Sequence, residues 1–173
     1  FLPKDSLLTF EEIIRLTKII VGQGALKVRL TGGEPLVRQD IEKLVSMLST
    51  LKGIHDLTLT TNAYLLPNKA EILKDAGLGR VTISLDTLDE AIFRRMNGRG
   101  FGTKNVLEGI CAAERAGLLP IKINAVIQRG VNDHTIVDLA KYFKDRGHSV
   151  RFIEYMDVGN RNGWKLDQVV SAN

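Results

Sequence analysis

The sequence contains a single cysteine, Cys111, among its 173 residues. One thiol excludes an internal disulfide, and it excludes a zinc or iron–sulfur site built from several cysteines of this chain alone. Long hydrophobic runs are also lacking, because the longest apolar stretches, such as residues 121–127, are strand-sized and still contain Lys122 and Asn124. Nothing approaches the ~20 apolar residues that a membrane span requires. The sequence therefore predicts neither a disulfide-rich protein nor a membrane protein.

A strong excess of one charge is lacking too, since 24 Lys and Arg stand against 20 Asp and Glu, for a formal net charge of +4. This small, dispersed excess argues against a nucleic-acid partner and is compatible with a small anionic ligand. The start, from Phe1 to Asp5, does not have the shape of a signal peptide. We therefore expect a cytoplasmic protein with neither a membrane nor a nucleic-acid partner.

What the sequence does show is an unbroken alternation of helices and strands within a single domain over residues 1–173. Thr9 and Glu12 form a capping box that opens the first helix, which ends near Gly22. Strands are predicted at 27–31, 57–62, 80–86, 121–127 and 150–156, and further helices near 41–48, 69–76, 89–96, 103–116 and 135–146. Such alternation implies parallel strands with right-handed helical crossovers. An open doubly wound sheet and an arc of a barrel both fit this order, and the tail from Asp157 to Asn173 has no clear periodicity.

One face of the predicted strands is polar in strand after strand, although parallel strands covered on both faces read as continuous apolar runs. The polar positions include Arg29, Thr60, Ser84, Asp86, Lys122 and Glu154. Burying such charges without partners would cost several kcal/mol each. We therefore predict a wet, ligand-filled cavity on this side, near the C-terminal strand ends. The alternatives are a solvent-facing side of an open sheet, or a structural network in which the charges pair with one another.

A glycine-rich segment, Thr31-Gly32-Gly33-Glu34-Pro35, directly follows the first predicted strand. Two glycines at a strand end permit positive φ and let a ligand approach the backbone closely. Glu34 adds a carboxylate acceptor and Pro35 stiffens the exit. A Gly-Gly pair alone is more often a simple turn, but after a strand with a polar face it indicates a ligand-binding loop.

This segment resembles the glycine-rich motif of radical S-adenosylmethionine (radical SAM) enzymes. Together with the segments at 27–30, 59–62, 84–86, 122–124 and 151–156, it makes nearly the whole chain resemble the GTP 3′,8-cyclase family of molybdenum cofactor biosynthesis. The resemblance implies a partial TIM-like (β/α) barrel, namely five parallel strands of an incomplete six-stranded barrel. It also implies that a [4Fe–4S] cluster cleaves S-adenosylmethionine and that GTP becomes (8S)-3′,8-cyclo-7,8-dihydroguanosine 5′-triphosphate.

The resemblance also assigns ligand-binding residues by their place in the matching motifs. The implied S-adenosylmethionine contacts are Gly32, Gly33, Glu34, Ser84 and Met156, and the implied GTP contacts are Arg29, Thr60 and Lys122. Arginine and lysine bind phosphate and a threonine hydroxyl donates, so the second set suits a triphosphate. No catalytic residue and no metal ligand is assigned in this chain.

The departure from the family lies in its cysteines, because the C-x3-C-x2-C cluster loop and three further C-terminal cysteines do not occur in this sequence. The resemblance therefore implies a fragment without either cluster, and we expect it to be inactive by itself. S-adenosylmethionine and the [4Fe–4S] clusters would be cofactors of the full-length parent. An exposed strand 27–31 favours self-association through the barrel edges. Two alternatives remain: another radical SAM enzyme, such as a peptide-modifying one, and a non-catalytic α/β module that binds a phosphorylated ligand.

Overall fold

The computed structural model describes residues 7–98, 100–158 and 163–171, so the start from Phe1 to Asp5 lies outside the described residues. It contains a five-stranded parallel sheet in the order β1-β2-β3-β4-β5. The strands are β1 (Lys27–Leu30), β2 (Asp56–Thr61), β3 (Arg80–Ser84), β4 (Lys122–Ile127) and β5 (Ser149–Glu154). The α-helices are α1 (Phe10–Gly22), α2 (Ile41–Ser49), α3 (Ala70–Asp75), α4 (Glu90–Asn97), α5 (Thr103–Arg115) and α6 (Ile136–Lys144).

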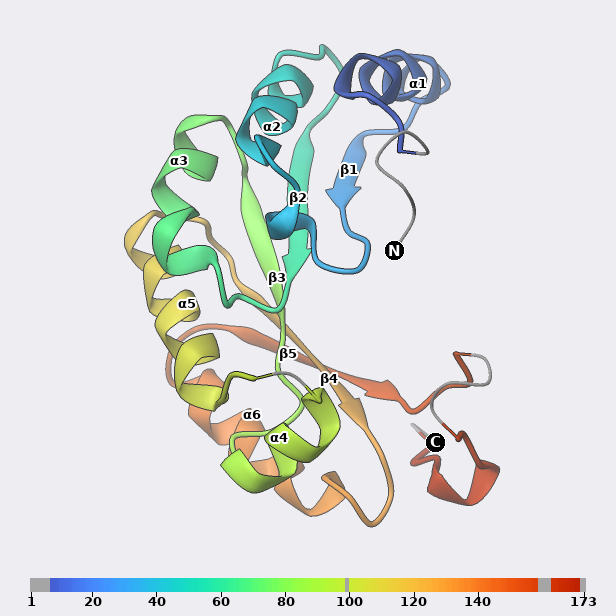
Figure 1. The fold of residues 1–173 in the computed structure, drawn as a ribbon, viewed down its shortest axis with the longest axis vertical. Helices are drawn as coiled ribbons and strands as arrows, with labels where there is room; N and C mark the ends of the chain where they lie inside the picture. Colours follow the sequence, from blue (N-terminus) through green and yellow to red (C-terminus); the bar gives the residue numbers. More distant parts are fainter. Residues whose placement is uncertain (1–6, 99, 159–162, 172–173) are drawn as a thin grey trace.

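The sheet is an arc of a barrel, because the strand order follows the chain without reversal. Helices α2, α3, α5 and α6 lie along one side of the strands, and the opposite side remains open (Figure 1). A doubly wound sheet would reverse its strand order and carry helices on both faces. The predicted barrel arc is therefore confirmed, and every predicted helix and strand is present with shifts of a few residues at its ends. None of the helices within the described ranges is long and apolar enough to cross a membrane.

The first two helices form as the sequence predicts. At the start of α1, the Thr9 side chain accepts a hydrogen bond from the Glu12 backbone N–H (3.2 Å), and the Glu12 carboxylate accepts one from the Thr9 N–H (2.8 Å). Helix α2 buries its whole predicted apolar face, which comprises Ile41, Leu44, Val45 and Leu48. Each such side chain contributes about 1.5–3 kcal/mol when it leaves water. The helical layer is therefore fixed to the strands by ordinary apolar burial.

Parallel register places the polar residues of β1 to β4 on one face of the sheet. Thr60 lies beside Thr82, and Thr82 lies beside Lys122. The intervening residues, such as Leu59, Ile83 and Ile123, are fully buried toward the helices. The sequence prediction of a polar face is thus confirmed for these four strands, and we call this side the polar face.

The last strand requires a correction, because Glu154 does not belong to the polar face. The register pairs Ile127 with Glu154 and Asn124 with Arg151. Since paired residues in adjacent strands point to the same side, Glu154 shares the helix side and Arg151 lies on the polar face. The sequence correctly groups Glu154 with Val150 and Phe152, but it gives that group to the wrong side. Alternation alone does not say which side of an edge strand packs on the core.

The tail, in which the sequence shows no periodicity, forms a short 3₁₀ helix and one strand-like contact. The 3₁₀ helix is η5 (Leu166–Gln168), and Val169 forms an isolated antiparallel bridge with Gln128. The Arg129 guanidinium donates to the Val169 carbonyl oxygen at 3.0 Å. These contacts tie the tail to the C-terminal end of β4.

Gly109 provides a test of how α5 packs onto the segment that follows β2. A Cβ at Gly109 would lie 2.3 Å from the backbone oxygen of Ala63, which cannot move aside like a flexible side chain. We expect Gly109→Ala to lower the free energy of unfolding by about 1–3 kcal/mol, although alanine favours helix. Urea denaturation measures the change.

Gly22→Ala is the matched control, because Gly22 also lies in a helix and a Cβ there would meet nothing within 4 Å. This variant should be neutral or slightly stabilised. Equal effects of the two substitutions would contradict the packing argument.

Candidate functional site

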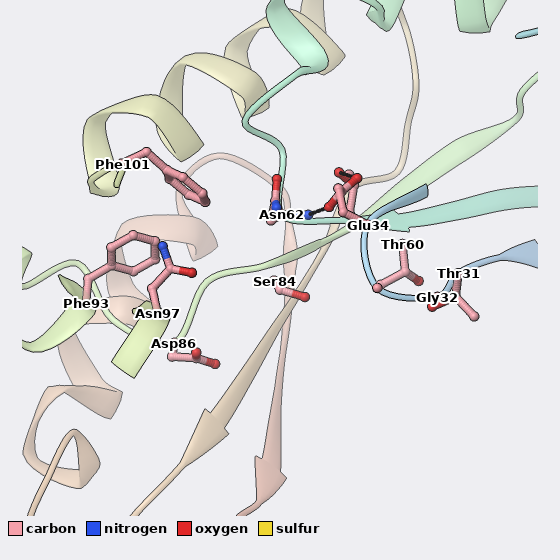
Figure 2. A pocket seen from close by; sticks show the side chains of 12 residues that line it. Thr31, Gly32, Glu34, Thr60, Asn62, Ser84, Asp86, Phe93, Asn97 and Phe101 are labelled. Carbon is pink, nitrogen blue, oxygen red and sulfur yellow. Dashed lines mark hydrogen bonds between the residues drawn. The ribbon is translucent and has the colours of Figure 1, made fainter. Parts of the chain in front are cut away.

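A cavity of about 320 Å³ lies at the C-terminal ends of β1, β2 and β3. This is the end of the strands at which α/β barrels place their ligands, and the volume is within the usual range of small-molecule sites. Five residues predicted from the sequence line it together: Gly32, Gly33, Glu34, Thr60 and Ser84. Figure 2 shows that other lining side chains come from beyond β3 and from the region of α4, among them Asp86, Phe93, Asn97 and Phe101.

The glycine loop presents bare backbone to this cavity. Gly32 has φ +150°, a conformation that L side chains rarely adopt. A Cβ at Gly33 would meet nothing within 4 Å, so space is open beside its backbone. The loop can therefore be approached closely by a ligand with amino, carboxylate or hydroxyl groups.

Glu34 holds this loop against the end of β2. Its Oε1 accepts hydrogen bonds from the Leu36 N–H (3.0 Å) and the Thr61 hydroxyl (2.8 Å), and its Oε2 accepts one from the Asn62 N–H (2.8 Å; Figure 2). The carboxylate therefore makes three bonds within the protein. This internal role was not apparent from the sequence, and the predicted contact of Glu34 with a ligand stays a prediction.

Glu34→Gln tests this clamp. An amide has one acceptor oxygen, so the variant cannot accept at both positions, and we expect a loss of about 1–3 kcal/mol in the free energy of unfolding. The backbone amides of Leu36 and Asn62 should also exchange hydrogen faster. Urea denaturation and hydrogen exchange measure the two effects.

Glu71→Gln, at an exposed position of α3, removes the same charge elsewhere and serves as the control. If the amides of Leu36 and Asn62 exchange as slowly in Glu34→Gln as in this control, the clamp does not exist.

Asp86 and Asn132 join the ends of β3 and β4. The Val126 N–H donates to Asp86 Oδ1 (2.8 Å), and the Asn132 side-chain amide donates to the backbone oxygens of Asp86 and Val126 (both 2.9 Å). Burial raises the pKa of the Asp86 carboxyl, and the bond from Val126 only partly opposes this effect. A carboxyl with a raised pKa that lines the cavity can exchange a proton or accept a ligand hydroxyl.

The pH dependence of stability follows from this raised pKa. A carboxyl whose folded pKa exceeds its unfolded value favours the fold at low pH, and that contribution is lost as the pH rises through the folded pKa. Asp86→Asn keeps an acceptor for Val126 and does not ionise. We expect the variant to gain stability relative to the wild type as the pH rises from about 4 to about 8.

Urea denaturation across this range checks the trend, with Asp75→Asn at an exposed position of α3 as the control for net charge. A constant difference between Asp86→Asn and the wild type would show that Asp86 does not titrate in this way.

An aromatic wall closes the cavity on the side of α4. Tyr64 stacks on Phe101 with ring centroids 4.8 Å apart, and Phe93 lies 6.0 Å from the Phe101 ring. The Nδ2 atom of Asn97 is buried at this wall and has no hydrogen-bond partner within the described part of the chain. Sequence reasoning missed Phe93, Asn97 and Phe101 as cavity residues because a helix and a glycine-rich loop carry them, and only tertiary packing brings them to the cavity.

Positive charge gathers on the polar face beside the cavity. Repulsion from Arg151, then from Arg80, together with burial, lowers the pKa of Lys122, and Lys27 adds to this effect. The sequence predicted Lys122 and Arg29 as ligand residues but missed Lys27 and Arg151. Arg151 could have been found had the opposite side of the last strand been assigned to the polar face.

The predicted site residues do not all meet in the cavity. Met156 is 53% exposed, lies beyond the end of β5 and is not among the residues that line the cavity. Arg29 and Lys122 are not among them either, although the register places both on the polar face. Thr60 lines the cavity and lies beside Thr82, the neighbour of Lys122, so it connects the two areas.

Buried polar atoms without partners show which ligand chemistry this face suits. Within the described residues, the unpartnered atoms on the polar face are Thr58 Oγ1, Thr60 Oγ1, Arg80 Nη1, Thr82 Oγ1 and Asn124 Oδ1. Native structures leave few such atoms, and a concentration of them marks a place for water or a polar ligand. The cavity and the polar face therefore fit a polar organic ligand such as S-adenosylmethionine.

An iron–sulfur cluster does not fit the side chains in the described part of this chain. In the ranges that the structure describes, no group of three or more His, Cys, Asp or Glu could hold a metal ion. Cys111 lies on α5 in the helical layer, beside Leu107 and Arg115 in a separate surface groove. The described part of the chain therefore offers no set of ligands for a cluster.

The fold and the cavity together define a class of protein: an α/β-barrel protein with a polar cavity at the carboxyl ends of its strands. The chain belongs to the radical SAM superfamily, whose family model matches residues 1–143.

Among curated proteins, the chain is 56% identical over 172 residues to a GTP 3′,8-cyclase from Acidothermus cellulolyticus, an alignment that covers 99% of this chain and 48% of that protein. It is 47% identical over 173 residues to the GTP 3′,8-cyclase of Staphylococcus saprophyticus. That alignment covers 100% of this chain and 51% of the relative. The chain thus spans about half the length of these relatives.

Solved structures with the same fold are less similar in sequence. Native anSMEcpe with bound AdoMet and Cp18Cys peptide matches with a TM-score of 0.69 at 20% identity, over 92% of this chain and 47% of that one. Coproporphyrinogen III oxidase from Escherichia coli, a radical SAM enzyme, matches with a TM-score of 0.66 at 12% identity, over 94% of this chain and 40% of that one. At these identities the likeness concerns the fold.

Proposed function

We propose that this chain is part of a GTP 3′,8-cyclase of molybdenum cofactor biosynthesis and forms the S-adenosylmethionine site and part of the GTP site. The observation that carries the proposal is the continuity between the glycine-loop cavity and the basic polar face, through Thr60. One concave side therefore suits two different ligands, a zwitterionic one at the strand ends and a polyanionic one below it. The 56% identity to a named cyclase over nearly the whole chain supports the same assignment.

In this proposal the cavity holds S-adenosylmethionine. The loop at Gly32 and Gly33 offers backbone groups to the amino acid end, and the Ser84 hydroxyl is a further polar contact. Met156 lies outside the cavity, so in this proposal the adenine extends beyond it toward the end of β5, where the polarizable thioether suits an aromatic ring. S-adenosylmethionine bound there would supply the group that accepts a hydrogen atom from the nucleotide ribose.

The polar face orients the triphosphate. Arg29 can bind phosphate oxygens with two N–H groups, Lys122 supplies a point charge and the Thr60 hydroxyl donates a hydrogen bond. We add Lys27 and Arg151 to this set because both lie near Lys122 on the same face. By holding the triphosphate, these residues fix the position of the ribose relative to the cavity. A reaction between two bound molecules requires such fixed positions.

We also propose that cluster ligands come from parts of a longer protein, since this sequence has one cysteine. On this proposal the chain binds nucleotides but does not by itself cleave S-adenosylmethionine. The strands β1 and β5 at the edges of the sheet would contact those other parts, and in the isolated chain they favour self-association.

Lys122→Glu in the full-length protein that carries this chain tests the proposal. Reversing a charge that faces the triphosphate should weaken GTP binding at least about tenfold while leaving S-adenosylmethionine binding within about twofold. Isothermal titration calorimetry under anaerobic conditions measures both affinities.

Lys52→Glu reverses a charge at an exposed loop position and is the matched control. Equal loss of both ligands in Lys122→Glu, with the fold intact, would assign Lys122 a structural role. Wild-type protein that binds S-adenosylmethionine but not GTP would favour a different radical SAM enzyme, and protein that binds neither would favour an unrelated module.

A further inference from the structure

An ion pair between Asp56 and Arg80 joins β2 to β3 on the polar face. Arg80 Nε donates to Asp56 Oδ1 (3.0 Å), and Arg80 Nη2 donates to Asp56 Oδ2 (2.6 Å), so the contact is bidentate. The two side chains are only 14% and 21% exposed, for Arg80 and Asp56 respectively. Arg80 Nη1 is buried and has no partner within the described residues. Neither residue belongs to the set that binds ligand in the proposed function.

Two lysines, one on each adjacent strand, lie near this pair. The register places Lys27 beside Asp56, and it places Thr82, two residues after Arg80, beside Lys122. The hydrogen bond from Arg80, together with attraction to Arg80, Lys27 and Lys122, lowers the pKa of the Asp56 carboxyl. Repulsion from Arg151 and then from Arg80 lowers the pKa of Lys122. The Asp56 carboxylate therefore lies near three positive side chains, those of Arg80, Lys27 and Lys122.

The pair changes the charge that a ligand meets. A bidentate ion pair is neutral overall, so Asp56 offsets part of the repulsion that Arg80 exerts on Lys122. Without Asp56, Arg80 would add a full positive charge close to Lys122. Because the pair is largely shielded from water, salt ions screen this difference less than they would at an open surface.

We propose that Asp56 is a specificity-determining residue of the anion site, which offsets part of the charge of Arg80 and so sets how tightly the polar face binds polyphosphate. This inference rests on the proposed function, because it takes the polar face to bind phosphate groups. It assigns the two residues no direct contact with ligand. Asp56 and Arg80 instead change the electrostatic potential around Lys27, Lys122 and Arg151.

Opposite substitutions separate this role from a structural one. Asp56→Asn leaves Arg80 uncompensated and should tighten binding of inorganic tripolyphosphate about 3- to 10-fold. Arg80→Gln leaves Asp56 uncompensated and should weaken it by a similar factor. Both variants should lose stability, because each breaks a partly buried ion pair. A merely structural pair would move binding in the same direction in both variants.

The experiment is calorimetric titration of the full-length protein that carries this chain with tripolyphosphate at about 50 mM and about 200 mM salt, with circular dichroism to verify folding. Glu42→Gln breaks the ion pair of Lys69 with Glu42, which is of similar exposure but links α2 to the start of α3, and is the matched control. It should leave tripolyphosphate binding unchanged.

The double variant Asp56→Asn/Arg80→Gln preserves the net charge and should bind tripolyphosphate within about twofold of the wild type, even where a single variant does not fold. A loss of binding of more than about tenfold in the double variant would make Arg80 a direct ligand and overturn the inference. Single variants that shift binding in the same direction, or that do not shift it, would also overturn it. Wild-type protein that does not bind tripolyphosphate would instead overturn the phosphate site of the proposed function.

Discussion

Parallel pairing in register holds the polar side chains of β1 to β4 on one face of the sheet, and the rest of the structure depends on this constraint. Side chains alternate along each strand, so the same pairing that places Thr60, Thr82 and Lys122 on the polar face buries Leu59 and Ile83 under the helices. A shift of one residue would exchange the two sets. The apolar core thus fixes the position of the site.

The loop at the end of β1 depends on a second, local interaction. Glu34 accepts hydrogen bonds from its own loop and from the end of β2, so the glycines are held against a neighbouring strand. Carboxylate–amide bonds of this kind are stronger than neutral ones. The acidic residue of the glycine motif therefore contributes to the rigidity of the site as well as to its charge.

The charges of the polar face fall into two groups with different environments. Arg80 has a bidentate partner in Asp56, whereas Lys122 lies among other cations that lower its pKa. Such crowding of like charges disfavours the fold unless an anion offsets it. The stability of the fold and the affinity for an anion are therefore coupled through the same few residues.

The sequence by itself determined the order of elements, the capping box of α1, the buried face of α2 and the polar face of β1 to β4, because each depends on local periodicity or on neighbours three or four residues apart. It also identified the glycine loop and Ser84, which line one cavity. The strand order alone left a doubly wound sheet and a barrel arc open, and the family resemblance predicted the barrel arc that the structure has. Only the tertiary structure decided the side to which Arg151 and Glu154 belong and the ion pair of Asp56 with Arg80. It also brought Phe93, Asn97 and Phe101 to the cavity from a helix and a loop. The physical reason is that these features depend on contacts between segments distant along the chain, which alternation and spacing do not encode.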